Sequence, residues 1–125
     1  MAEHALTAIL PCNDLDASEA FYGRFGFTRA GDEEGGDYRM LADGKGGYLH
    51  LHPAVEGWLI PGRNPFGLYL SCEDVDGLHA ACASLGPGRL SAPEDKPWGM
   101  YEFALSDPDG TLVRVGWPSR LRRQP

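Results

Sequence analysis

The chain carries the same pattern twice, 60 residues apart. Asn13–Asp16 and Glu73–Asp76 each precede an apolar pattern with helical spacing that ends at a glycine, Gly26 in the first copy and Gly86 in the second. Each copy has a short apolar run before it and strand-like segments after it. A repeat of this kind predicts two equivalent supersecondary units, which usually share one site.

The same order of elements is predicted for both copies: one strand, one helix and three further strands, a βαβββ module. We expect the first module at residues 5–52 and the second at residues 66–117 of a single domain of 125 residues. The segment 53–65 holds three prolines and two glycines, which predicts a connection between the modules. The expected fold class is therefore α+β.

Strand and helix positions follow from apolar periodicity and from turn residues. The expected strands are residues 5–10, 27–30, 38–42, 47–52, 66–72, 89–92, 100–106 and 111–117, with a proline-rich loop at 93–97. One helix follows Asp14 and a second covers residues 75–85. The buried stripe expected for the first helix is Leu15, Ala17, Ala20, Phe21 and Phe25.

Polar and breaking residues mark the ends of these elements. Pro11 should end the first strand, and Asn13 or Asp14 should cap the first helix. The acidic run Asp32–Gly36 predicts a solvated hairpin tip. The basic tail 118–125 is expected to be frayed, although its arginines could also contact a partner subunit.

The charge balance limits the partners. The net charge of −7 disfavours nucleic acid and anionic membranes and favours a neutral or cationic small molecule. The sequence has no apolar stretch of about 18 residues, and Met1–His4 lacks the basic start of a signal peptide, so we expect a cytoplasmic protein. Three scattered cysteines are expected to be reduced and structural.

Two stretches of the chain resemble a known family. Phe21-Tyr22 and Phe25-Gly26-Phe27, together with Asp107–Gly110 before the last strand, resemble the vicinal oxygen chelate superfamily. Its members include glyoxalase I, extradiol dioxygenases and bleomycin-binding proteins. The resemblance implies that each module curls its sheet into half of an open barrel, and that the two modules enclose a cup for the ligand.

The resemblance also implies where a divalent metal would bind. The enzymes of the superfamily use one residue in the first strand and one in the last strand of each module, which here are Thr7, His50, Gly67 and Arg114. Of these only His50 is a useful donor, and the Arg114 guanidinium would bring positive charge to a cation site. We therefore expect no metal, no other cofactor and no catalytic residue.

Aromatic side chains are expected in the cup instead. In residues 48–52, Tyr48 and the two histidines alternate with leucines, so they should share the face that lines the cup, and the same alternation places Tyr69 there. Trp98 stands where a loop meets a strand, and Trp58 stands in the connection between the modules. The alternative for each tryptophan is a lid over the core.

Within the superfamily, the stretches Glu94–Met100 and Asp107–Leu112 are most similar to the bleomycin-resistance subgroup. This similarity implies a homodimer that sequesters a planar or cationic antibiotic, such as bleomycin, by stacking its rings on aromatic side chains. Because the subgroup often has Glu at the position of His50, other antibiotics stay open as ligands. The expected ligand-binding residues are Trp98, Tyr48, His50, Tyr69, Trp58, Phe66, Tyr38 and Arg114.

Two other functions stay open. In the first, His50 and His52 hold a metal together with Glu102 or His4, and the protein is a glyoxalase-like lyase, isomerase or dioxygenase. Glu102 is also a candidate general base, although a carboxylate that alternates with apolar residues more often lies on the solvated face of a strand. In the second, the cup holds a metabolite for a larger biosynthetic or regulatory assembly.

Overall fold

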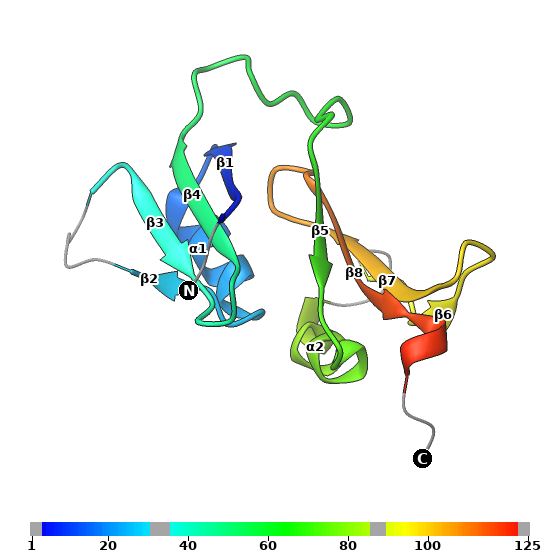
Figure 1. Ribbon diagram of the computed structural model, residues 1–125. Coiled ribbons are helices and arrows are strands. Elements are labelled where there is room, and N and C mark those ends of the chain that lie inside the picture. The colour runs from blue at the N-terminus through cyan, green and yellow to red at the C-terminus, as the bar shows by residue number, and fades with distance from the viewer. Residues whose placement is uncertain (1–3, 31–35, 86–89, 123–125) are drawn as a thin grey trace. The chain divides into compact units, whose positions relative to one another are not determined.

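The computed structural model describes residues 4–30, 36–85 and 90–122 (Figure 1). The first half of the chain forms β1 (Thr7–Cys12), α1 (Leu15–Gly23), β2 (Thr28–Arg29), β3 (Arg39–Ala42) and β4 (Tyr48–Pro53). The four strands make one sheet in the order β1-β4-β3-β2, in which β1 is parallel to β4 and the other pairs are antiparallel. This is the βαβββ order that the repeat predicts.

The second half repeats this topology. It forms β5 (Gly67–Ser71), α2 (Val75–Ala81), β6 (Glu94–Asp95), β7 (Met100–Ser106) and β8 (Leu112–Pro118), with short 3₁₀ turns at Ala83–Leu85 and Ser119–Leu121. Its sheet has the order β5-β8-β7-β6, and β5 is parallel to β8. Two open four-stranded sheets, each with one helix, confirm the predicted α+β class.

The chain divides into two compact units that do not quite follow the repeat. The first unit contains Met1–Asn64 and Pro108–Gly110, and the second contains Pro65–Asp107 and Thr111–Pro125. The Asp109 carboxylate accepts hydrogen bonds from the backbone N–H of Asn13 at 3.1 Å and from the Ser18 hydroxyl at 3.4 Å. The loop before β8 therefore completes the first unit beside the start of α1.

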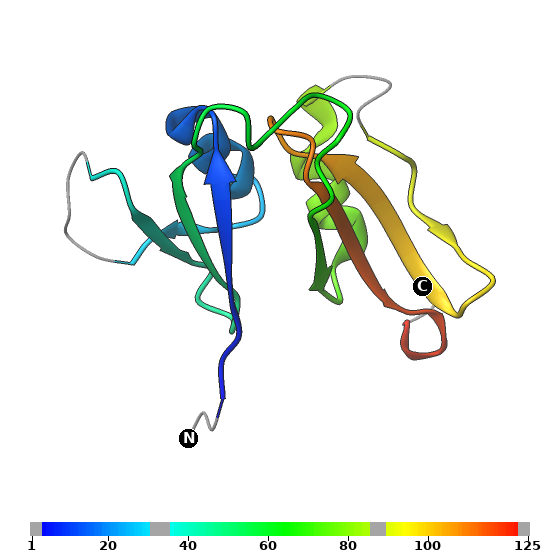
Figure 2. The same ribbon diagram turned by 90° about the horizontal axis from the view of Figure 1, so that it is seen from above.

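In each unit the helix contacts one face of its own sheet, α1 against β4 and α2 against β7 and β8 (Figure 2). The buried side chains of the first unit include Phe21, Tyr22, Leu41, Leu49 and Leu51; those of the second include Val75, Cys82, Phe103, Leu105, Val113 and Val115. Leu49 and Leu51 are buried, while their neighbours in β4 are half-buried or exposed. The expected alternation along β4 is therefore confirmed.

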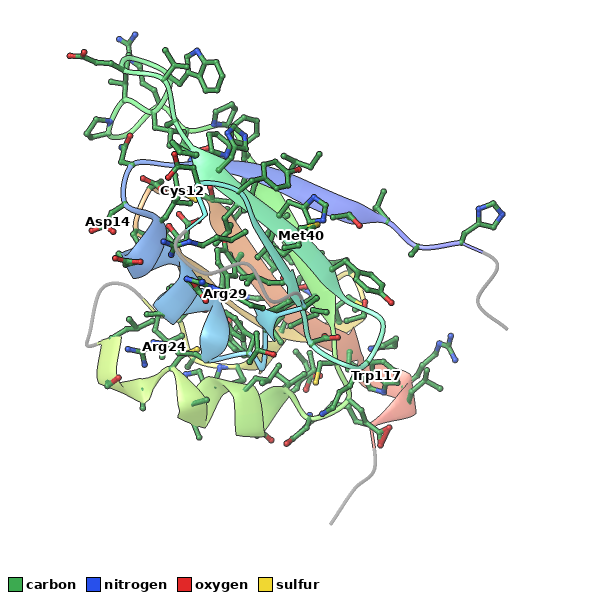
Figure 3. The ribbon with its side chains drawn as sticks, turned by 90° about the vertical axis from the view of Figure 1, so that its left-hand side faces the viewer. Cys12, Asp14, Arg24, Arg29, Met40 and Trp117 are labelled. Carbon is green, nitrogen blue, oxygen red and sulfur yellow. The ribbon has the colours of Figure 1, made fainter. Side chains whose placement is uncertain are left out.

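Figure 3 shows Asp14 at the start of α1. Its carboxylate accepts a hydrogen bond from the backbone N–H of Ala17 at 3.1 Å, so of the two predicted candidates, Asn13 and Asp14, the N-cap is Asp14. Met40, also labelled in Figure 3, lies beside His50 in the pairing of β3 with β4 and is exposed. The sheet face that carries His50 is thus the one that α1 leaves open.

Several predicted boundaries were wrong. Pro11 does not end β1, which continues to Cys12; proline is tolerated there because β1 is an edge strand. In α1 the predicted burial of Ala20 was wrong, because Ser18, Phe21 and Tyr22 take the buried positions. The second helix ends at Ala81, before a 3₁₀ turn, and not at residue 85.

The region before β7 also differs from the prediction. The strand expected at 89–92 is reduced, among the described residues, to a single bridge between Leu90 and Leu105, and the two-residue strand β6 lies inside the predicted loop 93–97. Arg89, Gly86 and most of the predicted hairpin tip lie outside the described residues. Both short pairings are made with β7, and one or two residues have no periodicity of their own from which such a pairing could be predicted.

The described part of the basic tail forms the 3₁₀ turn Ser119–Leu121, followed by Arg122. The guanidinium carbon of Arg122 lies 3.4 Å from the centre of the Tyr101 ring, and one guanidinium nitrogen lies 3.9 Å from the Asp76 carboxylate. A cation over an aromatic face with a carboxylate nearby stabilises such a turn.

None of the described helices is long and apolar enough to cross a membrane.

Candidate functional site

In the first unit, four aromatic or imidazole side chains from β4 and its neighbouring segments form one cluster. A hydrogen bond of 2.8 Å joins the Tyr38 hydroxyl and Nδ1 of His50. The Tyr38 and His52 rings are nearly parallel, 11° apart with centroids at 6.2 Å, and Trp58 meets His52 edge-on at 6.3 Å. The structure thus brings together Tyr38, His50 and Trp58, all expected ligand-binding residues.

In the second unit, a buried carboxylate gathers three donors. Glu102 on β7 is 1% exposed. Its Oε1 accepts hydrogen bonds from the Trp98 indole N–H at 2.9 Å and from the Tyr69 hydroxyl at 3.2 Å, and its Oε2 accepts one from the Arg114 guanidinium at 3.0 Å. Trp98, Tyr69 and Arg114 were each expected in the ligand site. Glu102 connects them.

Backbone geometry places the Trp98 indole beside this carboxylate. Trp98 lies in the turn between β6 and β7, which is closed by a hydrogen bond from the Lys96 N–H to the Met100 carbonyl at 2.8 Å. The next residue, Gly99, has a φ of +87°, which side chains other than glycine rarely adopt. The turn therefore brings the Trp98 indole next to the carboxylate of Glu102, which lies four residues later in the chain.

Tyr69 reaches the same carboxylate across a glycine. In the sheet, Gly116 of β8 lies between Ser71 of β5 and Glu102 of β7. A Cβ atom at residue 116 would overlap the Tyr69 hydroxyl oxygen and come within 2.9 Å of the Glu102 Cβ. Because Gly116 has no side chain, the Tyr69 phenol can cross over β8 and reach Glu102.

The Glu102 carboxylate is held in its charged form. Desolvation is the largest single influence and favours the neutral acid, but the hydrogen bonds from Trp98, Arg114 and Tyr69 and the Arg114 charge together outweigh it. The pKa of Glu102 therefore lies below its ordinary value of 4.5. The pKa of the Tyr69 hydroxyl is raised, first by burial and then by the neighbouring carboxylate, so it remains a donor.

The two units place related pairs at equivalent positions. Met40 pairs with His50 in the first sheet, and Ala104 pairs with Arg114 in the second, so His50 corresponds to Arg114. Tyr38 lies two residues before Met40, and Glu102 lies two residues before Ala104, so these two residues also correspond. The first unit therefore has a hydrogen-bonded phenol–imidazole pair where the second has an ion pair. The 64-residue offset between Tyr38 and Glu102 could have shown in the sequence that the two positions are equivalent.

The solvated position predicted for Glu102 was wrong, since three donors and the side chains that carry them cover it. Trp98 and Trp58 are 61% and 56% exposed, so neither is a lid over the core of its own unit. The other expected aromatic residues, Tyr38, Tyr48, Phe66 and Tyr69, are also exposed. Their contact with a ligand stays a prediction.

The residues at the superfamily's metal positions do not fit a divalent cation. Thr7 and Gly67 supply no strong donor, and Arg114 places a positive charge beside the nearest carboxylate, Glu102. Nδ1 of His50 is hydrogen-bonded to Tyr38. Within residues 4–30, 36–85 and 90–122, no three His, Cys, Asp or Glu side chains come together as a metal site would require.

A hollow of about 150 Å³ lies at the start of α2, away from the Glu102 cluster. It is lined by Glu73, Asp74, Val75, Asp76, Tyr101 and Arg122. Sites for drug-sized ligands are typically about 300–1,000 Å³ and mostly apolar. This hollow is smaller and polar, and it contains none of the expected ligand-binding residues.

Comparison with known proteins gives the family. Residues 3–115 match the profile of the Glyoxalase/Bleomycin resistance protein/Dioxygenase superfamily. A bleomycin resistance protein from Klebsiella pneumoniae is 32% identical, and the match covers 87% of this chain and 88% of the relative. The crystal structure of a bleomycin-binding protein complexed with bleomycin is 31% identical with a TM-score of 0.74, covering 91% of this chain and 98% of that one.

A second solved structure is that of another antibiotic binding protein. TnmS3, an antibiotic binding protein from Streptomyces sp. CB03234, is 27% identical with a TM-score of 0.69 and covers 94% of this chain and 98% of its own. The profile match spans nearly the whole chain, and the fold agrees with that of the bleomycin-binding protein. The chain belongs to the Glyoxalase/Bleomycin resistance protein/Dioxygenase superfamily.

Proposed function

We propose that the protein binds and sequesters a planar or cationic antibiotic, and that bleomycin is the first ligand to test. The observation that carries the proposal is an exposed indole that is nonetheless fixed, since the Trp98 N–H is held on a buried carboxylate. A fixed aromatic surface open to solvent suits the stacking of a flat ring. The Klebsiella relative and the bleomycin complex support bleomycin as the ligand.

Charge supports the same class of ligand. The chain has eighteen acidic and eleven basic side chains, so its field attracts cations and speeds their encounter. Next to Trp98, the Glu102 charge is already compensated by Arg114. Attraction of a cationic drug therefore comes from the surface as a whole, while the Trp98 and Tyr69 rings provide apolar contact. Stacking contributes about 0.5–1.5 kcal/mol per aromatic pair beyond the area buried.

Titration with bleomycin tests this function. Untagged, metal-stripped protein should show saturable quenching of tryptophan fluorescence at micromolar drug or below, with about one site per chain. The change should be smaller in Trp98→Phe and in Trp58→Phe if both indoles report the ligand. A folded protein that gives no response to bleomycin would rule out this drug as the ligand.

We further propose that the protein acts in the cytoplasm as a homodimer, as its similarity to the bleomycin-resistance subgroup implies. Sedimentation velocity at micromolar protein should give a species of twice the chain mass of 13.6 kDa. Two drug molecules should then bind per dimer. A monomer that binds bleomycin with full affinity would contradict a dimeric binding protein.

A further inference from the structure

The Glu102 carboxylate is buried, yet two of its three partners are exposed aromatic side chains. We propose that Glu102 is a positioning residue that fixes the Trp98 and Tyr69 rings in the orientation that receives the ligand. This inference rests on the proposed antibiotic-binding function and adds a residue that acts through others. Glu102 itself makes no contact with the drug.

Direct contact is disfavoured because both carboxylate oxygens are already occupied. Oε1 accepts two hydrogen bonds and Oε2 accepts the Arg114 guanidinium, which also neutralises the charge. A cationic group of the drug would have to displace one of these donors and enter a position that is 1% exposed. Removing a charge-assisted hydrogen bond from a buried carboxylate is costly.

Positioning matters because neither ring is enclosed by the core. Trp98 is 61% exposed in a turn, and Tyr69 is 44% exposed on β5, so burial alone does not fix their orientation. Immobilising a side chain at the moment of binding costs free energy, and a ring already fixed avoids that cost. Because both rings donate to the same oxygen, Oε1 of Glu102, their orientations relative to each other are also fixed.

The test compares two substitutions at the same residue, with bleomycin as the probe. Glu102→Met removes both acceptors and keeps the length of the side chain, and it should weaken binding about tenfold because both rings are released. Glu102→Gln loses the charge but keeps one acceptor oxygen, so most of the affinity should return. Were the charge itself recognised by a cationic drug, Glu102→Gln would bind as poorly as Glu102→Met.

A matched control separates local from general charge effects. Glu73→Gln makes the same charge change at an exposed residue of the second unit, outside the Glu102 cluster. Its affinity for bleomycin should stay within about twofold of the parent protein. A tenfold loss in this control would assign the effect to net charge and overturn the positioning role.

The indole resonance gives a readout that affinity alone lacks. The ¹⁵N–¹H signal of Trp98, identified by its disappearance in Trp98→Phe, should shift and exchange faster with water in Glu102→Met and remain near its parent position in Glu102→Gln. A signal that is unchanged in Glu102→Met would overturn the proposal. Thermal melting of each variant establishes that it is folded.

If Glu102→Met fails to fold, Tyr69→Phe performs the same test, since it removes one hydrogen bond to Glu102 and leaves the ring. About threefold weaker binding supports the proposal, and unchanged binding overturns it. The parent titration separates the two levels of inference. A parent protein that does not bind bleomycin removes this drug as the ligand and, with it, the role of Glu102 in binding it. A parent that binds, with Glu102→Met binding equally well, removes only the positioning role.

Discussion

Replacing Trp98 with alanine should weaken bleomycin binding at least tenfold while the melting temperature stays nearly unchanged. The indole is 61% exposed, so its removal takes little buried surface from the folded protein, but it removes the main stacking surface beside Glu102. Glu102 keeps two of its three donors in this variant. Isothermal titration and a thermal melt of the same sample measure both quantities.

Two controls define the result. Trp98→Phe retains a ring but has no N–H for Glu102, so its affinity should lie between those of the parent and the alanine variant. Leu121→Ala removes another exposed apolar side chain from the second unit and should leave binding unchanged. A large fall in the melting temperature of Trp98→Ala would mean that the indole supports the core, and the ligand site would then have to lie elsewhere.

Much of the fold could be predicted because its signals are local and repeated. The Asp14 N-cap follows from a short polar residue before an apolar helical pattern, and β7 covers the residues 100–106 expected from alternation. The strand β6 could not be placed, since a two-residue strand has no periodicity of its own. Its position depends on β7.

The site shows the same division. Alternation correctly separated the leucines of β4 from its tyrosine and histidines, because the period of a strand fixes the face of each side chain. Alternation could not give the depth of Glu102, which depends on what covers that face. Trp98 comes from a turn and Tyr69 from a distant strand across Gly116, and no local pattern contains these contacts.

Replacing Arg114 with methionine should lower the free energy of unfolding by about 1–3 kcal/mol at pH 7, because it leaves the buried Glu102 charge without its counter-ion. The loss should fall toward the lower end of this range, since the Arg114 side chain is 41% exposed and water screens part of the attraction. Urea denaturation from pH 3 to pH 7 measures the effect and its pH dependence.

The pH dependence identifies the cause. In the parent protein the pKa of Glu102 is lowered, so its contribution to stability is complete above its ordinary value of 4.5 and is lost as the pH falls through the lowered value. Without Arg114, burial should raise the pKa of Glu102. The stability difference between the two proteins should therefore shrink as the pH falls, and it should be lost once the pH has passed through the lowered pKa of Glu102 in the parent, because the carboxyl is then protonated in both.

The double variant Glu102→Met/Arg114→Met separates the effect of the unpaired Glu102 charge from the effect of losing the Arg114 side chain. With both charges gone, the remaining partners Trp98 and Tyr69 can hydrogen-bond to water, so the stability at pH 7 should recover most of the loss seen in Arg114→Met. Glu19 also has a lowered pKa, chiefly through its hydrogen bond from Arg29, but it is present in every variant and cancels from the differences. A constant difference between Arg114→Met and the parent from pH 3 to pH 7 would show that Glu102 carries no buried charge, and the ion pair would then contribute by packing alone.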